Sequence, residues 1–170
     1  RPVNRLDKNT SGIVIFAKNE YIQECLIRQM KNNIFKKNYL AILVGNLNKL
    51  SGTIIAPISR KCGSIIEREI NTNGDEAITH FKLVKNFHVN NQELALVNFT
   101  LETGRTHQIR LHSKHIGHPI LGDTLYGTAS PLISRQALHA YKVQFQHPIT
   151  KKQINIETDL PDDIKNIIPK

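Results

Sequence analysis

The chain has 170 residues, 39% of them hydrophobic, which is enough to bury the core of one globular domain. Its 23 Lys and Arg against 14 Asp and Glu give a formal net charge of +9. An anionic partner is therefore reasonable, although a solvated positive face would give the same count. Two cysteines are too few for a disulfide framework, and no apolar run of about 18 residues or secretion signal is present. These features disfavour a membrane-spanning or exported protein and predict a cytoplasmic one.

The first quarter of the chain predicts a loop, a strand, a helix and a second strand. The polar octet 5–12 precedes the short β-branched run 13–17, which predicts a buried strand. Apolar side chains recur at four-residue steps over 19–34, as in an amphipathic helix. Residues 38–44 are apolar on both alternating faces, so they predict a central strand that is covered on both sides.

Sheet dominates the remainder of the sequence. Further strand patterns, separated by turn residues, cover the ranges 52–57, 76–84, 93–101, 140–146 and 153–158. Thr106 is a candidate cap for a helix that runs through 107–116 and ends at Gly117. Residues 162–164 predict a last helical turn.

The densest group of informative side chains is the segment 103–112. It combines a glycine-containing turn with a helix start, two arginines and two histidines, and such a site favours phosphate or RNA. The alternative is a basic surface helix with its arginines paired to nearby carboxylates. Four histidines in and after this segment raise the idea of a metal-dependent hydrolase, but their spacing fits neither H-E-x-x-H nor a zinc finger. They are His107, His112, His115 and His118.

Asp7 lies between Arg5 and Lys8, in the loop before the first predicted strand. A nearby cation keeps a carboxylate ionised at neutral pH, and an ionised carboxylate can act as a nucleophile. The alternative is a turn aspartate that bonds its own backbone ahead of Thr10. The local sequence leaves both roles open.

The run from Asn4 to Gly12 closely resembles the His-Arg-Leu-Asp-x-x-Thr-Ser-Gly signature of the RluA-type pseudouridine synthases. Residues 36–41 resemble the Lys-x-Tyr strand of that family. Residues 103–127 resemble its Thr-Gly-Arg-Thr-His-Gln-Ile-Arg, Gly-His-Pro-Ile and Gly-Asp-x-x-Tyr-Gly pieces, and 138–148 resemble its C-terminal portion. One departure is Asn4, where the family has histidine, and it predicts a change in local hydrogen bonding.

The resemblance implies an α+β fold with a mixed, mainly antiparallel β-sheet and flanking helices around a central catalytic cleft, the pseudouridine synthase fold. Residues 1–170 would be a single catalytic domain, a fragment without the upstream strands and any S4-like domain. The implied enzyme is an RNA pseudouridine synthase, an isomerase that flips a uridine out of structured RNA, breaks its C–N bond and forms a C–C bond. No cofactor and no metal is implied.

The resemblance also assigns roles to single residues. Asp7, Tyr39 and Arg110 are the implied catalytic residues, with an Asp7–Arg110 ion pair, and Tyr39 would stack on uracil and assist proton removal. Whether Asp7 attacks the uracil ring or the ribose stays open. Arg5 would take part in flipping, and Leu138 would line the uracil pocket. Candidate RNA phosphate contacts are Lys36, Lys37, Arg105 and His107.

The implied partner is RNA, foremost ribosomal RNA of the large subunit, with transfer RNA as an alternative, and the protein is expected to be a monomer without a membrane partner. The main rival is a non-catalytic RNA-binding fragment. The presence of Asp7, Tyr39 and Arg110 together argues against that rival, because a binding module does not need all three.

Overall fold

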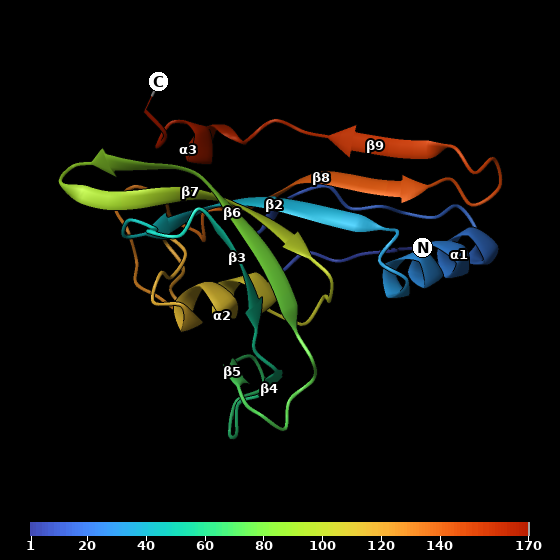
Figure 1. Ribbon diagram of the computed structural model, residues 1–170, viewed down its shortest axis with the longest axis horizontal. Coiled ribbons are helices and arrows are strands. Elements are labelled where there is room, and N and C mark those ends of the chain that lie inside the picture. The colour runs from blue at the N-terminus through green and yellow to red at the C-terminus, as the bar shows by residue number, and fades with distance from the viewer. Residues whose placement is uncertain (170) are drawn as a thin grey trace.

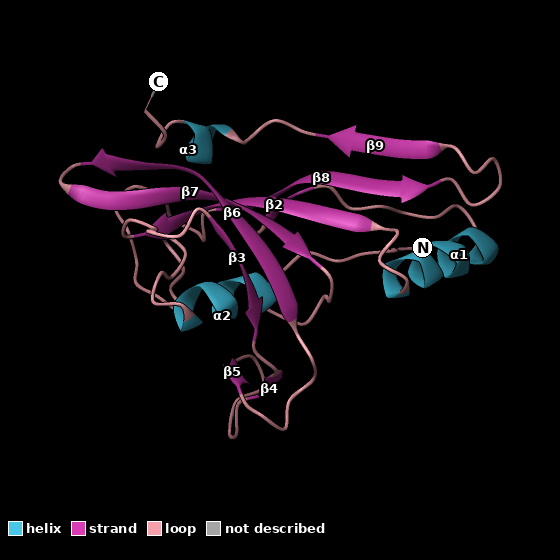
Figure 2. Ribbon diagram, in the orientation of Figure 1, coloured by secondary structure: helices cyan, strands magenta, loops and turns pink. Residues whose placement is uncertain are grey.

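The computed structural model describes residues 1–169 and shows a large twisted sheet with three helices around it (Figures 1 and 2). The elements in chain order are β1 (Ser11–Gly12), α1 (Glu20–Lys31), β2 (Lys36–Val44), β3 (Ser51–Ile55), β4 (Ile58–Arg60), β5 (Arg68–Ile70), β6 (Ile78–Val89), β7 (Gln92–Leu101), α2 (Gln108–His115), β8 (Leu138–Gln146), β9 (Gln153–Glu157) and α3 (Asp162–Lys165).

Seven strands form the main sheet in the order β1-β8-β2-β7-β6-β3, and β9 also pairs with β8. Among the strands of residues 1–169, only the pairing of β1 with β8 is parallel, so the sheet is mixed and mainly antiparallel. The hairpin β4–β5 forms a second small sheet that projects away from the main one in Figure 1. We call residues 58–70 the finger.

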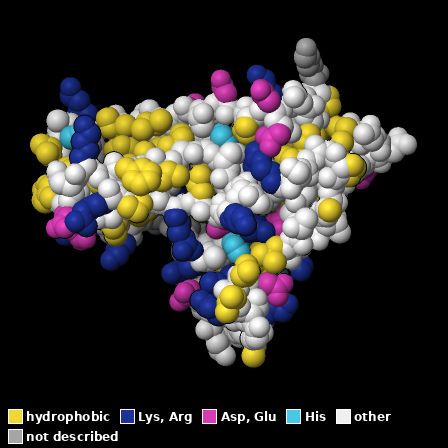
Figure 3. Space-filling view, turned by 180° about the vertical axis from the view of Figure 1, so that it is seen from behind, with side chains coloured by type: hydrophobic (Ala, Val, Ile, Leu, Met, Phe, Trp, Pro, Cys, Tyr) yellow, Lys and Arg dark blue, Asp and Glu magenta, His cyan; other side chains and the backbone are white. Residues whose placement is uncertain are grey.

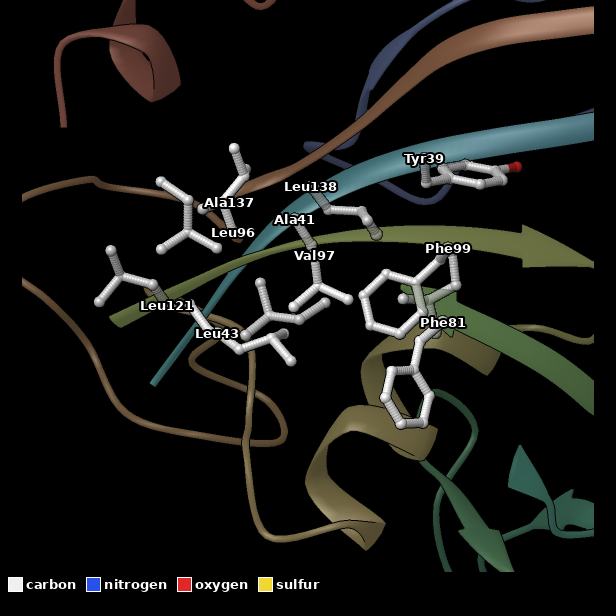
Figure 4. Close-up of a cluster of buried hydrophobic side chains, with 14 of the residues drawn as sticks. Tyr39, Ala41, Leu43, Phe81, Leu96, Val97, Phe99, Leu121, Ala137 and Leu138 are labelled. Carbon is white, nitrogen blue, oxygen red and sulfur yellow. The ribbon is translucent and has the colours of Figure 1, made fainter. Parts of the chain in front are cut away.

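β2 lies at the centre of the core, as its sequence predicts. Ala41, Ile42 and Leu43 are fully buried, because α2 lies below the strands in Figure 1 and α3 lies above them. Side chains two residues apart leave a strand on the same face. Tyr39 therefore continues the row of Ala41 and Leu43, at the end of the packed cluster (Figure 4).

The predicted helix at 19–34 is confirmed, with tighter ends. The Asn19 side chain caps it by accepting a hydrogen bond from the Ile22 amide at 2.9 Å. Leu26 packs the helix against Val143 and Phe145. The helix ends at Lys31, so the last three predicted residues lie outside it.

The prediction of a buried strand at 13–17 is wrong. The regular strand covers only Ser11 and Gly12, and Phe16 makes an isolated bridge to Pro2 with 66% of its surface exposed. Gly12 has a φ of +123°, which turns the chain out of the strand immediately. The apolar residues that follow form a loop. The Val3 amide holds this loop by donating a hydrogen bond to the Ile15 carbonyl at 2.8 Å.

The prediction of Thr106 as a helix cap is also wrong. The cap residue of α2 is His107, in the left-handed region at φ +59°, and it makes no side-chain capping bond. The Thr106 hydroxyl instead accepts a hydrogen bond from Arg5. Gly117 follows the helix at φ +84°, in accord with its predicted role as the stop.

The later strand predictions are confirmed, with ends within two residues of those predicted except that β6 continues to Val89, five residues beyond the predicted end. The short helix at the end of the chain is confirmed as well. The sequence patterns missed the finger strands β4 and β5, which are three residues each. None of the described helices combines the length and apolar character that a membrane crossing demands.

Replacing Gly12 by alanine should loosen the loop that holds Asp7. An added Cβ would lie 2.3 Å from the Ala140 carbonyl oxygen, a contact that the parallel β1–β8 pair cannot relieve without separating. We expect a loss of about 2–4 kcal/mol of unfolding free energy in urea. The control is Gly63→Ala, which has φ +75° but no atom within 4 Å of the new Cβ and should cost only about 1 kcal/mol. Equal losses would contradict the steric argument.

Candidate active site

A cleft of about 650 Å³ opens between the loop that carries Asp7, helix α1, strand β2 and the turn after β7. The space-filling view shows the surface hollowed between the α1 side and the finger, with Lys and Arg side chains beside the hollow (Figure 3). Of the residues with predicted roles, six line this cleft. They are Arg5, Asp7, Lys37, Tyr39, Arg105 and Leu138.

The backbone of the Asp7 loop is fixed from the far end of the chain. The Gln136 side chain donates to the Lys8 carbonyl at 2.6 Å and to the Thr10 hydroxyl at 3.1 Å. The Thr10 amide donates a hydrogen bond to the Asp7 backbone carbonyl at 3.0 Å, which closes the turn. The Asp7 carboxylate makes no hydrogen bond to any described residue, so it does not serve as the side-chain cap of its own turn.

Asn4 ties the start of this loop to the segment that follows it. Its side-chain oxygen accepts from the Ile15 amide at 2.8 Å, and its amide group donates to the Ile13 carbonyl at 3.2 Å. Asn4 stands where the family has histidine, and these two hydrogen bonds are the ones that asparagine makes there. They fix the position of the first residues of the loop.

Tyr39 lies beneath the cleft with 7% of its surface exposed. Burial, followed by the negative charge of Asp7, raises the pKa of its phenol, so Tyr39 keeps its proton at neutral pH. In Figure 4 its hydroxyl points away from the buried cluster, while Leu138 lies within that cluster. Tyr39 thus faces the cleft with a polar atom, and Leu138 supplies an apolar wall.

Arg110 does not pair with Asp7, contrary to the sequence-based prediction. Its guanidinium donates from Nε and Nη2 to the two carboxylate oxygens of Asp123, both at 2.7 Å. Within residues 1–169, no ion pair of 4.0 Å or less joins Arg110 to Asp7. Burial acts to lower the pKa of the Arg110 guanidinium. The pKa is nevertheless raised, first by the hydrogen bond to Asp123, then by the negative charge of Asp123 and then by that of Asp7. The direct partner of Arg110 is therefore Asp123 and not Asp7.

Asp123 is a site residue that the residue-by-residue assignment missed. It is 1% exposed and also accepts from the amides of Leu125 at 3.0 Å and Tyr126 at 3.2 Å. Burial opposes its charge, yet the bonds from Arg110 and those amides hold the pKa of its carboxyl below the usual value. The signal for this residue is the Gly-Asp-x-x-Tyr-Gly piece, which contains Asp123.

Gln108 is a second missed residue, and it shapes one wall of the cleft. Its side-chain oxygen accepts from the Thr103 hydroxyl at 2.8 Å and from the Arg105 amide at 2.9 Å. Its amide group donates to the Ile78 carbonyl at 3.0 Å and the Thr79 hydroxyl at 2.9 Å. Gln108 thereby joins the turn after β7 to strand β6.

The four candidate phosphate contacts divide into two groups. Lys37 lies in the cleft beside Gly104, where burial lowers the pKa of its amine, and Arg105 lies on the adjoining rim. Lys36 is exposed but does not line the cleft. His107 instead shares a hydrogen bond with the Tyr126 hydroxyl at 2.9 Å, and burial lowers the pKa of its ring.

Two of the remaining histidines have structural partners. His112 is fully buried, with its ring nitrogens 2.9 Å from the Thr79 hydroxyl and 2.9 Å from the Ala56 carbonyl. His118 lies 3.0 Å from the Val44 carbonyl. The described part of the chain contains no cluster of three or more His, Cys, Asp or Glu side chains with metal-binding geometry.

Comparison with known proteins bears on both sequence and fold. The family model described as RNA pseudouridylate synthase matches residues 1–115. The uncharacterized RNA pseudouridine synthase YhcT of Bacillus subtilis is 46% identical over 98% of this chain and 55% of its own length. Ribosomal large subunit pseudouridine synthase D of Nitrosomonas europaea is 38% identical over 98% of this chain and 49% of its own length.

The fold agrees with these sequence matches. The solved structure of Human RNA Pseudouridylate Synthase Domain Containing 1 superposes with a TM-score of 0.80 at 26% identity, covering 94% of this chain and 68% of that one. The expected pseudouridine synthase fold is therefore confirmed. The chain spans about half the length of the curated relatives that it matches. By the family match over residues 1–115 and by its RluA-type motifs, the chain belongs to the RNA pseudouridylate synthase family.

Proposed function

We propose that this chain is the catalytic part of an RNA pseudouridine synthase that isomerises uridine in structured RNA, with Asp7 as its nucleophile. The observation that carries the proposal is the Asp7 carboxylate, which faces the cleft without a hydrogen bond from any described residue, next to Tyr39 and Leu138. A carboxylate without internal bonds is available to react, whereas one engaged in a cap is not.

The cleft suits a flipped base. Its volume of about 650 Å³ lies in the ordinary range for sites that enclose a small organic group. Tyr39 and Leu138 offer a ring and an aliphatic side chain for a planar uracil. Arg5 is exposed at the rim of the cleft, where its guanidinium can occupy the space that the uridine leaves in the RNA stack.

The chemistry requires no net change in composition. The bond between ribose C1′ and uracil N1 breaks, the uracil turns in the cleft, and a bond forms between C1′ and C5. The hydrogen on C5 then leaves as a proton, and N1 gains one. Attack by Asp7 on the ring or on the ribose both fit this balance.

The bonding of Arg110 is compatible with a reactive carboxylate at Asp7. Arg110 is held by Asp123 and so leaves both carboxylate oxygens of Asp7 free. Tyr39 enters the reaction protonated, so it can donate a hydrogen bond to the uracil. Removal of the C5 proton by Tyr39 requires that it first lose its own proton.

The same proposal names the substrate and setting. Relatives called ribosomal large subunit pseudouridine synthase D favour large-subunit ribosomal RNA over transfer RNA. Residues 1–170 act as one catalytic domain, as a monomer and in the cytoplasm. Lys37 and Arg105 are the phosphate contacts that the cleft supports best.

The test is release of tritium from RNA that carries 5-tritiated uridine, because isomerisation expels the hydrogen at C5. We expect the chain to release tritium from ribosomal RNA at a rate proportional to enzyme concentration, with transfer RNA measured in parallel. RNA binding without tritium release would identify an RNA-binding module and overturn the proposed activity.

A further inference from the structure

Arg135 joins three parts of the chain that lie far apart in the sequence. Its Nη1 atom donates a hydrogen bond to the Asn9 carbonyl at 3.1 Å, in the loop that carries Asp7. The same nitrogen donates to two carbonyls at the start of β8, at 3.3 and 3.4 Å. The Nε and Nη2 atoms donate to the two carboxylate oxygens of Asp163, in α3, at 2.7 and 2.9 Å. One guanidinium group thus connects the Asp7 loop, β8 and the last helix.

The bond from Arg135 is made where the backbone of the Asp7 loop is least favourable. Asn9 has a φ of +68°, in the left-handed region that residues other than glycine adopt only at a cost in free energy. Such a conformation persists where the surrounding structure holds it. Gln136, the neighbour of Arg135, donates to the carbonyl before Asn9 and to the hydroxyl of Thr10 after it. Two adjacent side chains therefore fix the course of the loop.

Helix α3 is a firm support for Asp163. Ile164 is fully buried and Ile167 is 7% exposed, and both belong to the main hydrophobic cluster. The helix lies on the face of the sheet opposite to α2 (Figure 1). Its hydrogen bonding to Arg135 is the main cause that lowers the pKa of the Asp163 carboxyl, so this group is ionised at neutral pH. Arg135 therefore faces an anion whose helix is anchored in the core.

The geometry of the pair determines where the third nitrogen of Arg135 points. Two parallel hydrogen bonds fix the plane of a guanidinium group as well as its position. With Nε and Nη2 on Asp163, Nη1 is the atom that is left to reach the Asp7 loop. Because the Asp163 carboxylate is 45% exposed, the pair contributes little to overall stability. Its main effect is on the orientation of Arg135.

Arg135 and Asp163 do not line the cleft, so any effect on the chemistry passes through the backbone of the loop. The turn that carries Asp7 is closed by the bond from the Thr10 amide to the Asp7 carbonyl, on either side of Asn9. A shift at Asn9 would therefore move the reacting carboxylate. Misplacement of a reacting group by about 1 Å can lower a rate by as much as about 100-fold.

We propose that Arg135 and Asp163 are positioning residues for the reaction at Asp7: Asp163 orients Arg135, and Arg135 holds the backbone of the loop at Asn9. The reaction itself rests on the proposed function. The last helix then controls the rate of the chemical step without touching the RNA.

The test compares Asp163→Asn with Asp162→Asn. Both variants remove one negative charge from the first turn of α3, but Asp162 is exposed and forms no ion pair within residues 1–169. Tritium release gives kcat and KM for each protein. Hydrogen exchange of the Thr10 amide, resolved by NMR, reports directly on the turn that carries Asp7. The midpoint of urea unfolding measures overall stability.

We expect Asp163→Asn to lower kcat about tenfold with KM unchanged. Exchange of the Thr10 amide should become about tenfold faster, while the urea midpoint stays close to that of Asp162→Asn. Arg135→Lys should show the same pattern, because a single ammonium group cannot hold both carboxylate oxygens of Asp163 and also reach Asn9. Asp163→Glu keeps a charged acceptor with two oxygens, and its kcat should return to within about threefold of that of the parent.

Values of kcat and of Thr10 exchange equal to those of Asp162→Asn would overturn the proposal. A lower kcat that is accompanied by a matching fall in the urea midpoint would also overturn it, because the pair would then be merely structural. If the parent protein releases no tritium, the proposed activity fails. Faster Thr10 exchange in Asp163→Asn would in that case still support the holding of the loop by Asp163 and Arg135.

Discussion

Asp7→Asn should reduce tritium release by on the order of 10⁴-fold, because an amide cannot replace the ionised carboxylate as a nucleophile. The side chains are nearly isosteric, and the loop is held by backbone and side-chain groups other than the Asp7 carboxylate. The variant should therefore fold normally. It should also bind RNA at least as tightly as the parent, since a negative charge has been removed from the cleft that we propose receives a polyanion.

The matched control for this variant is Glu102→Gln, which removes a negative charge from the lining of the same cleft. Glu102 is exposed and lies beside His80. The activity of the Glu102→Gln variant should therefore stay within about threefold of that of the parent. Burst and steady-state tritium release are measured with equal concentrations of folded protein, checked by circular dichroism. Comparable losses in both variants would mean that the general charge of the cleft matters and that Asp7 has no special chemical role.

Asp123→Ala should be strongly destabilising, by about 3–5 kcal/mol, because it leaves the Arg110 charge buried without a partner. The side chains of Arg110 and Asp123 are 8% and 0% exposed. The matched control is Asp163→Ala, which breaks a similar two-pronged pair with Arg135 at a site where the carboxylate is 45% exposed. That loss should stay below about 1 kcal/mol. Urea unfolding at pH 7 measures both.

The pH dependence of the Asp123 effect follows from its depressed pKa. The carboxyl has an ordinary pKa of 3.8 and a lower one in the folded protein. The stabilisation is therefore fully present above pH 3.8 and is lost as the pH falls through the folded-state value. The difference between parent and Asp123→Ala should be constant from pH 7 to about pH 5 and should narrow in stronger acid. A constant difference down to unfolding would contradict the ion-pair origin of the effect.

The elements that sequence patterns predicted well are those with a repeated apolar spacing. α1 and β2 have such patterns over many residues, so packing and local preference agree there. The run 13–17 has the composition of a strand but finds few backbone partners, because Gly12 turns the chain away. The finger strands are too short for any periodicity to be visible.

For the site, the sequence predicted which residues lie together better than it predicted how they bond to one another. Motif resemblance selected Asp7, Tyr39 and Leu138, and all three line one cleft, while their chemical roles stay predictions. It implied the wrong partner for Arg110, an ion pair with Asp7, because the choice between Asp7 and Asp123 depends on how the turn after α2 folds back. Pairing between distant residues is decided by tertiary packing, for which a single motif carries no signal.

The parallel pairing of β1 with β8 links the order of synthesis to the ordering of the loop that carries Asp7. Ser11 reaches His139 at 2.9 Å across 128 positions, and Gln136 holds the loop from a similar distance along the chain. A nascent chain has Asp7 outside the ribosome long before these anchors are made, and contacts of such long range form late in folding. The loop that carries Asp7 therefore stays unorganised until residues 136–139 have emerged, and a polypeptide terminated before them would lack both of these anchors.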